Sequence, residues 1–223
     1  MQIRIPQLIG MLLLCLAIPV QAQDTQVASQ WKNEISATMV SLRTNYSGGY
    51  GSAYYFTIMS GISYRRNLGP HACRLGMDFR DYWTRGYSDG MNAQRYHEGK
   101  FKIGYQFAFS HRKVKIYTAL DLIYLLGKYD SDFQGGYAGL YSKLDLITNG
   151  IGFGPALGLQ YRFMRSLSIS METNYEFIWF NEKGTIVRGD SFYSVNKMTI
   201  PVDRNQFFFG WNPISSIALN FGF

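Results

Sequence analysis

The sequence predicts an all-β fold, an eight-stranded antiparallel up-and-down transmembrane β-barrel. Three observations support this prediction. Apolar and polar residues alternate with a period of two in eight separate runs, as strands with two different faces require. Aromatic residues make up 17% of the chain and there are 23 glycines, while charged residues are only 17%, a composition that favours pleated sheets. The connections between the runs are alternately short and long, which is typical of barrels that cross a membrane.

The first element is a predicted signal peptide, residues 1–22, which is cleaved and is not part of the fold. Arg4 supplies its positive region, Leu8 to Ile18 its apolar region and Val20-Gln21-Ala22 its small-residue cleavage site. Residues 23–33 are then expected to be an N-terminal periplasmic lead-in, followed by the barrel at 34–223. The mature chain keeps a single cysteine, Cys73, so we expect no internal disulfide.

The eight runs define the strands in order along the chain. The clearest alternation places Phe101, Ile103 and Tyr105 on one face and Lys102 and Gly104 on the other. The first run is the least regular, and the pattern leaves open which of its faces is apolar. Each run is longer than the 9–11 residues that cross a bilayer as a tilted strand. The predicted strands are 34–46, 53–65, 72–84, 97–109, 114–127, 150–162, 167–180 and 206–223.

Alternation alone does not say which face points inward, because a soluble barrel or sandwich would bury the aromatic face. Small residues on one polar face, at Gly152, Gly154, Ala156 and Gly158, favour a narrow lumen in which longer polar neighbours need room. The unequal connections favour the same conclusion. Short connections are predicted at 66–71, 110–113 and 163–166, and long ones at 85–96, 128–149 and 181–205.

The whole pattern resembles the eight-stranded outer-membrane β-barrel proteins of Gram-negative bacteria, of the OmpA/OmpX type. The resemblance covers nearly all of residues 34–223 and depends on the pattern rather than on a specific motif. It implies a place in the cell outer membrane and contact with its lipid bilayer. It also implies recognition by the barrel assembly machinery through alternate residues of the last strand. These residues are Ile217, Leu219, Phe221 and Phe223.

The predicted lumen contains charges of both signs, and an eight-stranded barrel is just wide enough for side chains to fill it. We therefore expect a closed structural core of paired charges, with a gated proton or ion path as the alternative. The predicted lumen charges are Arg74, Asp78, Arg80, Lys102, Lys115, Asp121, Glu172 and Glu176. Turn lengths predict partners across neighbouring strands: Lys102 with Asp121, Gly152 with Glu176, Gly154 with Asn174 and Ala156 with Glu172.

The short connections are strongly basic. Loss of Arg4 with the signal peptide lowers the formal charge from +7 to +6, and the short connections hold six positive charges. We expect them to form a periplasmic rim that meets anionic lipid head groups or an acidic partner, unless they only solubilise the turns. No basic stripe alternates with stacking aromatics, so nucleic acid is not an expected partner. The rim residues are Arg65, Arg66, Arg112, Lys113, Arg162 and Arg165.

No motif predicts a cofactor, a metal site or catalysis. Some small barrels modify lipid A with a histidine near the outer leaflet, and here only His97 is near a long connection, close to Ser88, Asp89 and Glu98. The last long connection, with Arg188-Gly189-Asp190, is predicted to be a hairpin. The expected function is a structural or accessory role in the cell envelope, alongside other envelope proteins. A surface adhesin that acts through the long connections and a lipid A-modifying enzyme are the alternatives.

Overall fold

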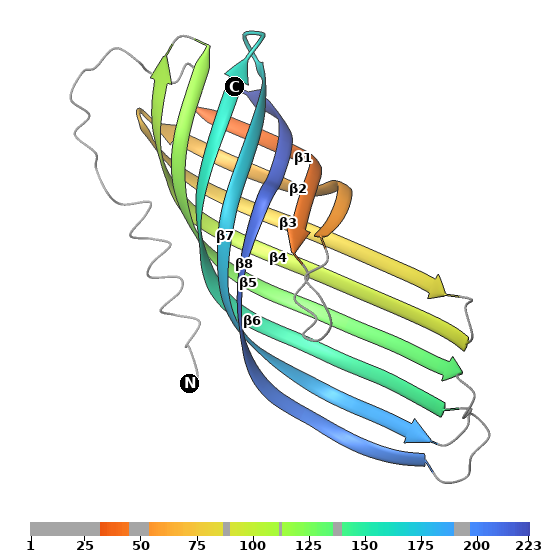
Figure 1. The fold of residues 1–223 in the computed structure, drawn as a ribbon. Helices are drawn as coiled ribbons and strands as arrows, with labels where there is room; N and C mark the ends of the chain where they lie inside the picture. The colour runs from red at the N-terminus through yellow and green to blue at the C-terminus, as the bar shows by residue number, and fades with distance from the viewer. Residues whose placement is uncertain (1–31, 45–53, 87–89, 112, 136–139, 190–196) are drawn as a thin grey trace.

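The computed structural model describes residues 32–44, 54–86, 90–111, 113–135, 140–189 and 197–223. The predicted signal peptide 1–22 and most of the lead-in 23–33 therefore lie outside the described residues. Eight antiparallel strands form one closed sheet in which each strand pairs with its neighbours in the chain and the last pairs with the first (Figure 1). This confirms the predicted all-β, up-and-down arrangement. The strands are β1 (Asn33–Thr44), β2 (Tyr54–Leu68), β3 (His71–Gly86), β4 (Gly90–His111), β5 (Val114–Gly135), β6 (Leu140–Arg162), β7 (Leu167–Gly189) and β8 (Lys197–Gly222).

The ring closes between the first and last strands. Asn33 N–H donates to the Phe223 carbonyl at 3.1 Å, and Phe223 N–H donates to the Asn33 carbonyl at 3.0 Å. The register between β1 and β8 shifts between Thr38, opposite Ala218, and Val40, opposite Ile217, so Met39 is the extra residue of a bulge. The buried positions of β1 are therefore even-numbered before the bulge, at Glu34, Ser36 and Thr38, and odd-numbered after it, at Ser41. This shift explains why the first run looks irregular in the sequence.

The connections differ from their predicted lengths. Residues 85–96 and 128–149 were expected to be long loops, but most of them are strand, because β4, β5 and β6 are 22 or 23 residues long. The predicted hairpin within 181–205 is confirmed, with β7 ending at Gly189 and β8 beginning at Lys197. Backbone hydrogen bonds can pair two strands whether or not their side chains are apolar. The strands therefore continue past the point where the apolar–polar alternation weakens, and the sequence pattern predicted them too short.

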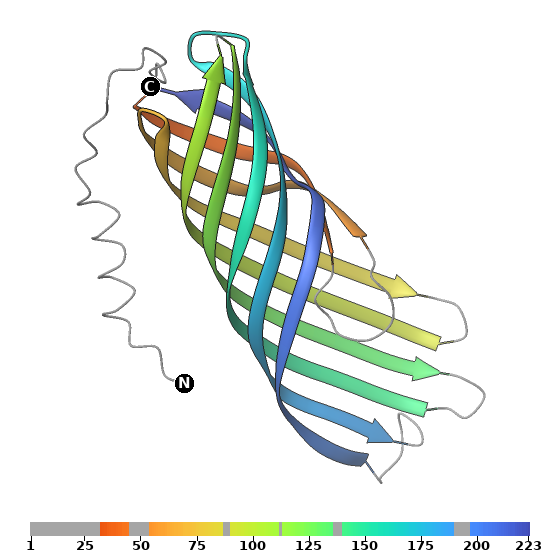
Figure 2. The ribbon, with the colours of Figure 1, turned by 60° about the vertical axis from the view of Figure 1, so that its left-hand side comes forward.

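Two ends of the molecule can be distinguished. The short-turn end holds the connections 69–70, 112–113 and 163–166, and the C-terminus lies there (Figure 1). At the opposite, long-strand end, β3 to β8 continue past the ends of β1 and β2 as a curved sheet, as the second view also shows (Figure 2). The pairing of β1 with β8 extends to Leu42 and Ile214, and that of β2 with β3 to Gly61 and Asp78.

The predicted register of two hairpins is wrong by two residues. Lys102 lies opposite Ile123 rather than Asp121, because the β4–β5 turn begins after His111, which pairs with Val114. On β6 and β7 the same shift places Gly152 opposite Ile178, Ala156 opposite Asn174 and Gly158 opposite Glu172. A slip of two residues keeps every side chain on its predicted face and changes only its partner.

Large apolar side chains cover the outside of the barrel. Phe109 is 64% exposed, Leu120 53% and Trp179 52%, whereas their strand neighbours Ala108 and Ala119 are buried. Small residues of β6 face the interior as predicted. A Cβ at Gly158 would lie 2.1 Å from the ring Cζ of Tyr117, so this glycine makes room for a tyrosine in the lumen.

Candidate functional site

All eight predicted lumen charges point into the barrel. Asp121 and Glu176 are fully buried, while Lys102 and Arg74 keep about a tenth of their side-chain surface exposed, 10% and 12%. Alternation along the strands places them there, since inward residues are separated by one outward residue. The structure arranges these charges in layers along the lumen, which we call the lumen charge network.

The layer at the short-turn end contains Glu34, Arg65, Tyr117 and Gln160. Arg65 Nη1 donates to Glu34 Oε1 at 2.8 Å, and its guanidinium carbon lies 5.1 Å from the centre of the Tyr117 ring. Gln160 Nε2 donates to the second Glu34 oxygen at 2.7 Å. The prediction that Arg65 belongs to the basic rim is therefore wrong. β2 continues to Leu68, so Arg65 lies within the strand on an inward position instead of in the turn.

The middle layer is organised by Arg74. Its Nη1 and Nη2 donate to the two oxygens of Glu172 at 2.8 and 3.0 Å, the paired geometry that suits a guanidinium and a carboxylate. Arg74 Nε lies 3.0 Å from Asp121 Oδ1. The hydroxyl of Tyr117 donates to Glu172 at 3.2 Å and so links this layer to the one below. The Arg74 guanidinium thus forms ion pairs with two buried carboxylates, those of Glu172 and Asp121.

The upper layer is built around two lysines. Lys100, which is fully buried, places Nζ 2.7 Å from Glu176 and 3.5 Å from Glu98. Lys102 Nζ lies 2.8 Å from Asp78 Oδ2 and 3.9 Å from Glu176. Lys100 and Glu98 were not among the predicted lumen charges, although both continue the inward alternation of the predicted strand 97–109.

The described lumen charges balance. With Glu34, Arg65, Glu98 and Lys100 added to the eight predicted charges, the network holds six acidic and six basic side chains, so its formal charge is zero. Further along β7, buried Glu182 is paired with Arg204 at 2.6 Å and adds no net charge. Buried charges persist in proteins when they are paired, because desolvation of an unpaired charge costs several kcal/mol. The acidic members are Glu34, Asp78, Glu98, Asp121, Glu172 and Glu176. The basic members are Arg65, Arg74, Arg80, Lys100, Lys102 and Lys115.

An apolar cluster lies beside the upper charges, with Ile123 opposite Lys102 and Leu125 opposite Lys100 in the sheet. Ile123, Leu125, Ile178 and Phe180 are buried together and Phe208 packs against them. This cluster was not predicted, because apolar residues on both faces of this stretch of β5 hide which of them point inward. The cluster and the paired charges together fill the lumen. The cavity beside Arg74 and Glu172 measures about 40 Å³, room for only a few waters.

His97 lies on the outer surface, and Glu98, the one described residue among its predicted neighbours, faces the other way. Its Nδ1 is 3.2 Å from Asp81 Oδ1 on the neighbouring strand, where the His97 side chain is half-buried and that of Asp81 is exposed. Glu98 points into the lumen, and Ser88 and Asp89 lie outside the described residues. A hydrolase of this kind needs a nucleophile within hydrogen-bond reach of the base. The histidine contact that the structure shows is instead with a carboxylate.

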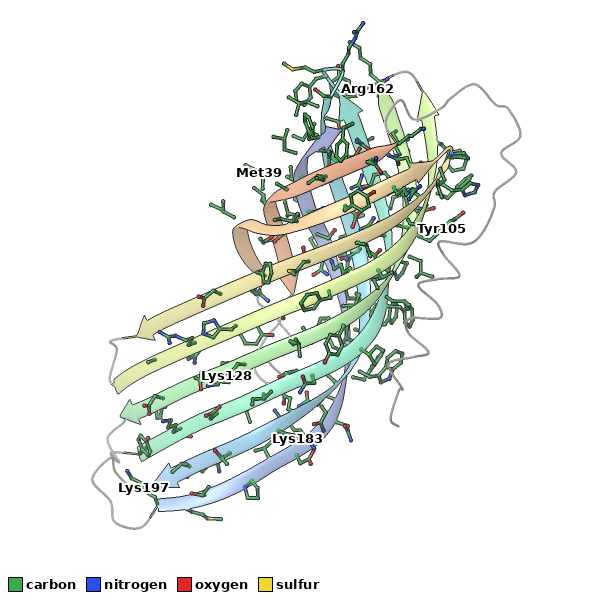
Figure 3. All side chains as sticks on the ribbon, turned by 180° about the vertical axis from the view of Figure 1, so that it is seen from behind. Met39, Tyr105, Lys128, Arg162, Lys183 and Lys197 are labelled. Atoms are coloured by element: carbon green, nitrogen blue, oxygen red, sulfur yellow. The ribbon has the colours of Figure 1, made fainter. Side chains whose placement is uncertain are left out.

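The remaining predicted residues lie at the two ends of the barrel. Arg66, Lys113 and Arg165 are exposed at the short-turn end, where Arg162, labelled in Figure 3, is half-buried. Arg112 lies outside the described residues. Arg188 and Gly189 end β7, and Asp190 is also outside the described residues. Of the four terminal residues, Leu219, Phe221 and Phe223 are exposed on the outer surface, and Ile217 is half-buried.

Comparison with known proteins finds no family model that matches the chain and no curated protein with detectable sequence similarity to it. Among the described residues, no group of three or more histidine, cysteine, aspartate or glutamate side chains is placed to hold a metal ion. The same part of the chain contains no helix that is long and apolar enough to cross a membrane.

Proposed function

We propose that the protein is an eight-stranded outer-membrane β-barrel of a Gram-negative cell envelope, resembling the OmpA/OmpX type, with a closed polar lumen and no catalytic activity. Its role is structural, or it is an accessory subunit beside other envelope proteins. The observation that carries the proposal is the reversal of sides: large apolar side chains face outward and paired charges face inward. This arrangement suits a surrounding lipid phase.

The height of the apolar belt supports a membrane location. Along β5, outward apolar residues extend from Val114 to Leu126, with Thr118 the one polar residue among them. At about 3.3 Å per residue and a tilt near 45°, this segment rises about 28 Å, close to the ~25 Å apolar band of outer-membrane barrels. Monomeric soluble proteins rarely expose a contiguous apolar surface of this extent.

The orientation follows from the turns. Outer-membrane barrels place short turns in the periplasm and longer hairpins outside the cell. The short-turn end with Arg66, Lys113 and Arg165 then faces the periplasm, where these exposed cations meet anionic head groups or an acidic partner subunit. The longer strands of β4 to β8 project from the outer surface of the cell.

Pull-down of the tagged full chain from native membranes in mild detergent tests the proposal, with stoichiometry by mass spectrometry. A barrel that requires detergent for extraction supports the membrane location, and a partner recovered near one-to-one supports the accessory role. A barrel recovered alone supports the structural role. Recovery in the soluble fraction without detergent would contradict the membrane location itself.

A further inference from the structure

Two strand edges at the long-strand end are not covered by β1 or β2. β8 begins at Lys197, but β1 pairs with it only from Ile214 onward. β3 continues to Gly86, but β2 pairs with it only up to Asp78. The two short strands end while β3 to β8 continue as a curved sheet (Figures 1 and 2). An open edge of this kind presents backbone N–H and C=O groups to another strand.

The backbone groups that face each open edge follow from the ladders. Ala108 N–H donates to the Pro70 carbonyl at 2.7 Å, so even-numbered residues of β3 bond to β4 and odd-numbered ones face the open edge. Gly222 N–H donates to the Ser166 carbonyl at 2.9 Å, so by the same alternation odd-numbered residues of β8 face its open edge. Pro201 is odd-numbered and has no N–H to donate, which is tolerated at an edge.

Part of the β8 edge lies within the apolar belt. Phe207, Phe209 and Trp211 are 53%, 55% and 48% exposed on the outer face, and each turns its backbone N–H and C=O toward the open edge. Lipid offers no hydrogen bonds, and open sheet edges do not occur in the hydrocarbon region of membrane proteins. In a membrane, this edge therefore needs a strand beside it.

The directions of the two open strands select the partner. β3 runs from the short-turn end to the long-strand end, and β8 runs back. When two copies have the same orientation in a membrane, β8 of one is therefore antiparallel to β3 of the other, whereas two β8 strands run in the same direction. A two-fold axis along the membrane normal joins each β8 to β3 of the other copy and uses all four open edges. A single strand from another protein would only create a new open edge.

We propose that the long strands of two copies pair edge to edge, β8 of each with β3 of the other, in a two-fold symmetric dimer. The strands β3 to β8 of both copies then form one ring. Odd-numbered residues pair with odd-numbered residues, so outward side chains stay outward. On β3, Asp81, Trp83 and Arg85 face the open edge and give each junction about six backbone hydrogen bonds. The inference rests on the proposed membrane location, which gives both copies the same orientation.

Disulfide cross-linking in native membranes tests this pairing. Two chains with Cys73→Ser are co-produced, one tagged and with Asp81→Cys on β3, the other with one cysteine on β8. A mixed disulfide then requires two copies to meet. We expect a mixed-dimer band on non-reducing gels that is strongest at one β8 position. Lys183→Cys, on β7 and one strand away from the edge, should form it at least tenfold more slowly. The scanned β8 positions are Asp203, Asn205, Phe207, Phe209 and Trp211.

Arg85→Pro and Arg85→Ala are a matched pair. Both remove the same side chain, but only proline removes the N–H that faces the open edge, and neither removes a hydrogen bond to β4. In the Asp81→Cys chain, Arg85→Pro should slow mixed-disulfide formation at least tenfold and Arg85→Ala less than twofold.

The dimer proposal has clear contrary outcomes. No mixed disulfide at any scanned position, a rate as high at Lys183→Cys, or equal effects of the two Arg85 variants would overturn it. So would a disulfide between Trp211→Cys and Ser47→Cys within one chain, because residues 45–53 would then cover the edge. In a chain that needs detergent for extraction, these results leave the membrane location intact. Recovery of the chain without detergent would instead contradict that location.

Discussion

Replacement of Arg74 by methionine tests whether paired charges hold the lumen together. Arg74 contacts Glu172 through two hydrogen bonds of 2.8 and 3.0 Å and Asp121 at 3.0 Å. Methionine keeps much of the side-chain volume but leaves both buried carboxylates without their main cation. Loss of one partner from a buried ion pair typically costs about 3–5 kcal/mol. We therefore expect Arg74→Met to lower the free energy of unfolding by about that amount, which is a factor of roughly 10² to 10⁴ in the unfolding equilibrium.

Urea unfolding of the barrel in lipid vesicles, followed by tryptophan fluorescence, measures this change. Lys115→Met is the matched control, since Lys115 Nζ donates to Asn67 Oδ1 at 3.2 Å and is only half-buried. It should cost about 1 kcal/mol, the usual contribution of one hydrogen bond.

A second substitution distinguishes charge from packing. Asp121→Asn in the Arg74→Met background removes one of the two uncompensated carboxylates and restores a neutral lumen, while Glu172 keeps the hydrogen bond from Tyr117. The double variant should recover at least half of the lost free energy of unfolding. If Arg74→Met costs less than about 1 kcal/mol, or if Asp121→Asn brings no recovery, the lumen is not stabilised by charge pairing in the way described.

Three further predictions follow from the lumen and the rim. Planar-bilayer recordings should show no steady single-channel openings, because the charge network and the cluster around Ile178 fill the lumen; steady openings would contradict a closed core. Gly158→Leu should lower the free energy of unfolding in urea by about 1–3 kcal/mol, because its Cβ would meet the Tyr117 ring. Gly99→Ala is the control and should change the free energy of unfolding by less than about 0.5 kcal/mol, since its Cβ would meet no heavy atom within 4 Å. Equal effects of the two variants would contradict the packing argument. Glutamine at Arg66, Arg112, Lys113, Arg162 and Arg165 should weaken association with anionic vesicles by about 1 kcal/mol per charge that faces the membrane, measured by flotation. Glutamine at Lys143, Lys183 and Lys197, at the long-strand end, is the control; unchanged flotation of the five-site variant would contradict a lipid-binding rim.

The inward and outward faces could be predicted from the sequence, but the strand partners could not. The alternation of inward and outward residues predicts that the side chains of Lys102 and Asp121 point into the barrel, and in the structure both do. Their pairing depends on where the β4–β5 turn begins, and a turn of two residues after His111 fits the sequence as well as one after Ser110. A two-residue slip leaves the faces unchanged, so the hydrophobic pattern contains no information against it.

The network itself could be predicted only in part. Glu34 was missed because the bulge at Met39 breaks the alternation of the first strand, which hid its inward face. Arg65 was assigned to the rim because the turn was expected three residues too early, at 66 instead of 69. The apolar cluster was missed for a different reason. Ile123 and Leu125 have apolar neighbours on the outward face, so the local pattern has no period of two.

The two parts of the lumen have different physical consequences. Paired charges tolerate water, and the small cavity beside Arg74 has room for it. The apolar cluster around Ile178 excludes water, but it does not separate the charges from the long-strand end, because Lys102 lies opposite Ile123 and Lys100 opposite Leu125 in the sheet. Beyond the cluster, Glu182 is buried on β7 and Arg204 Nη2 lies 2.6 Å from it, so ion pairs continue toward the open side of the long strands. An ion that crosses the barrel would therefore have to displace paired side chains at each level of the lumen, and the charge pairs and the cluster together make the closed core a barrier.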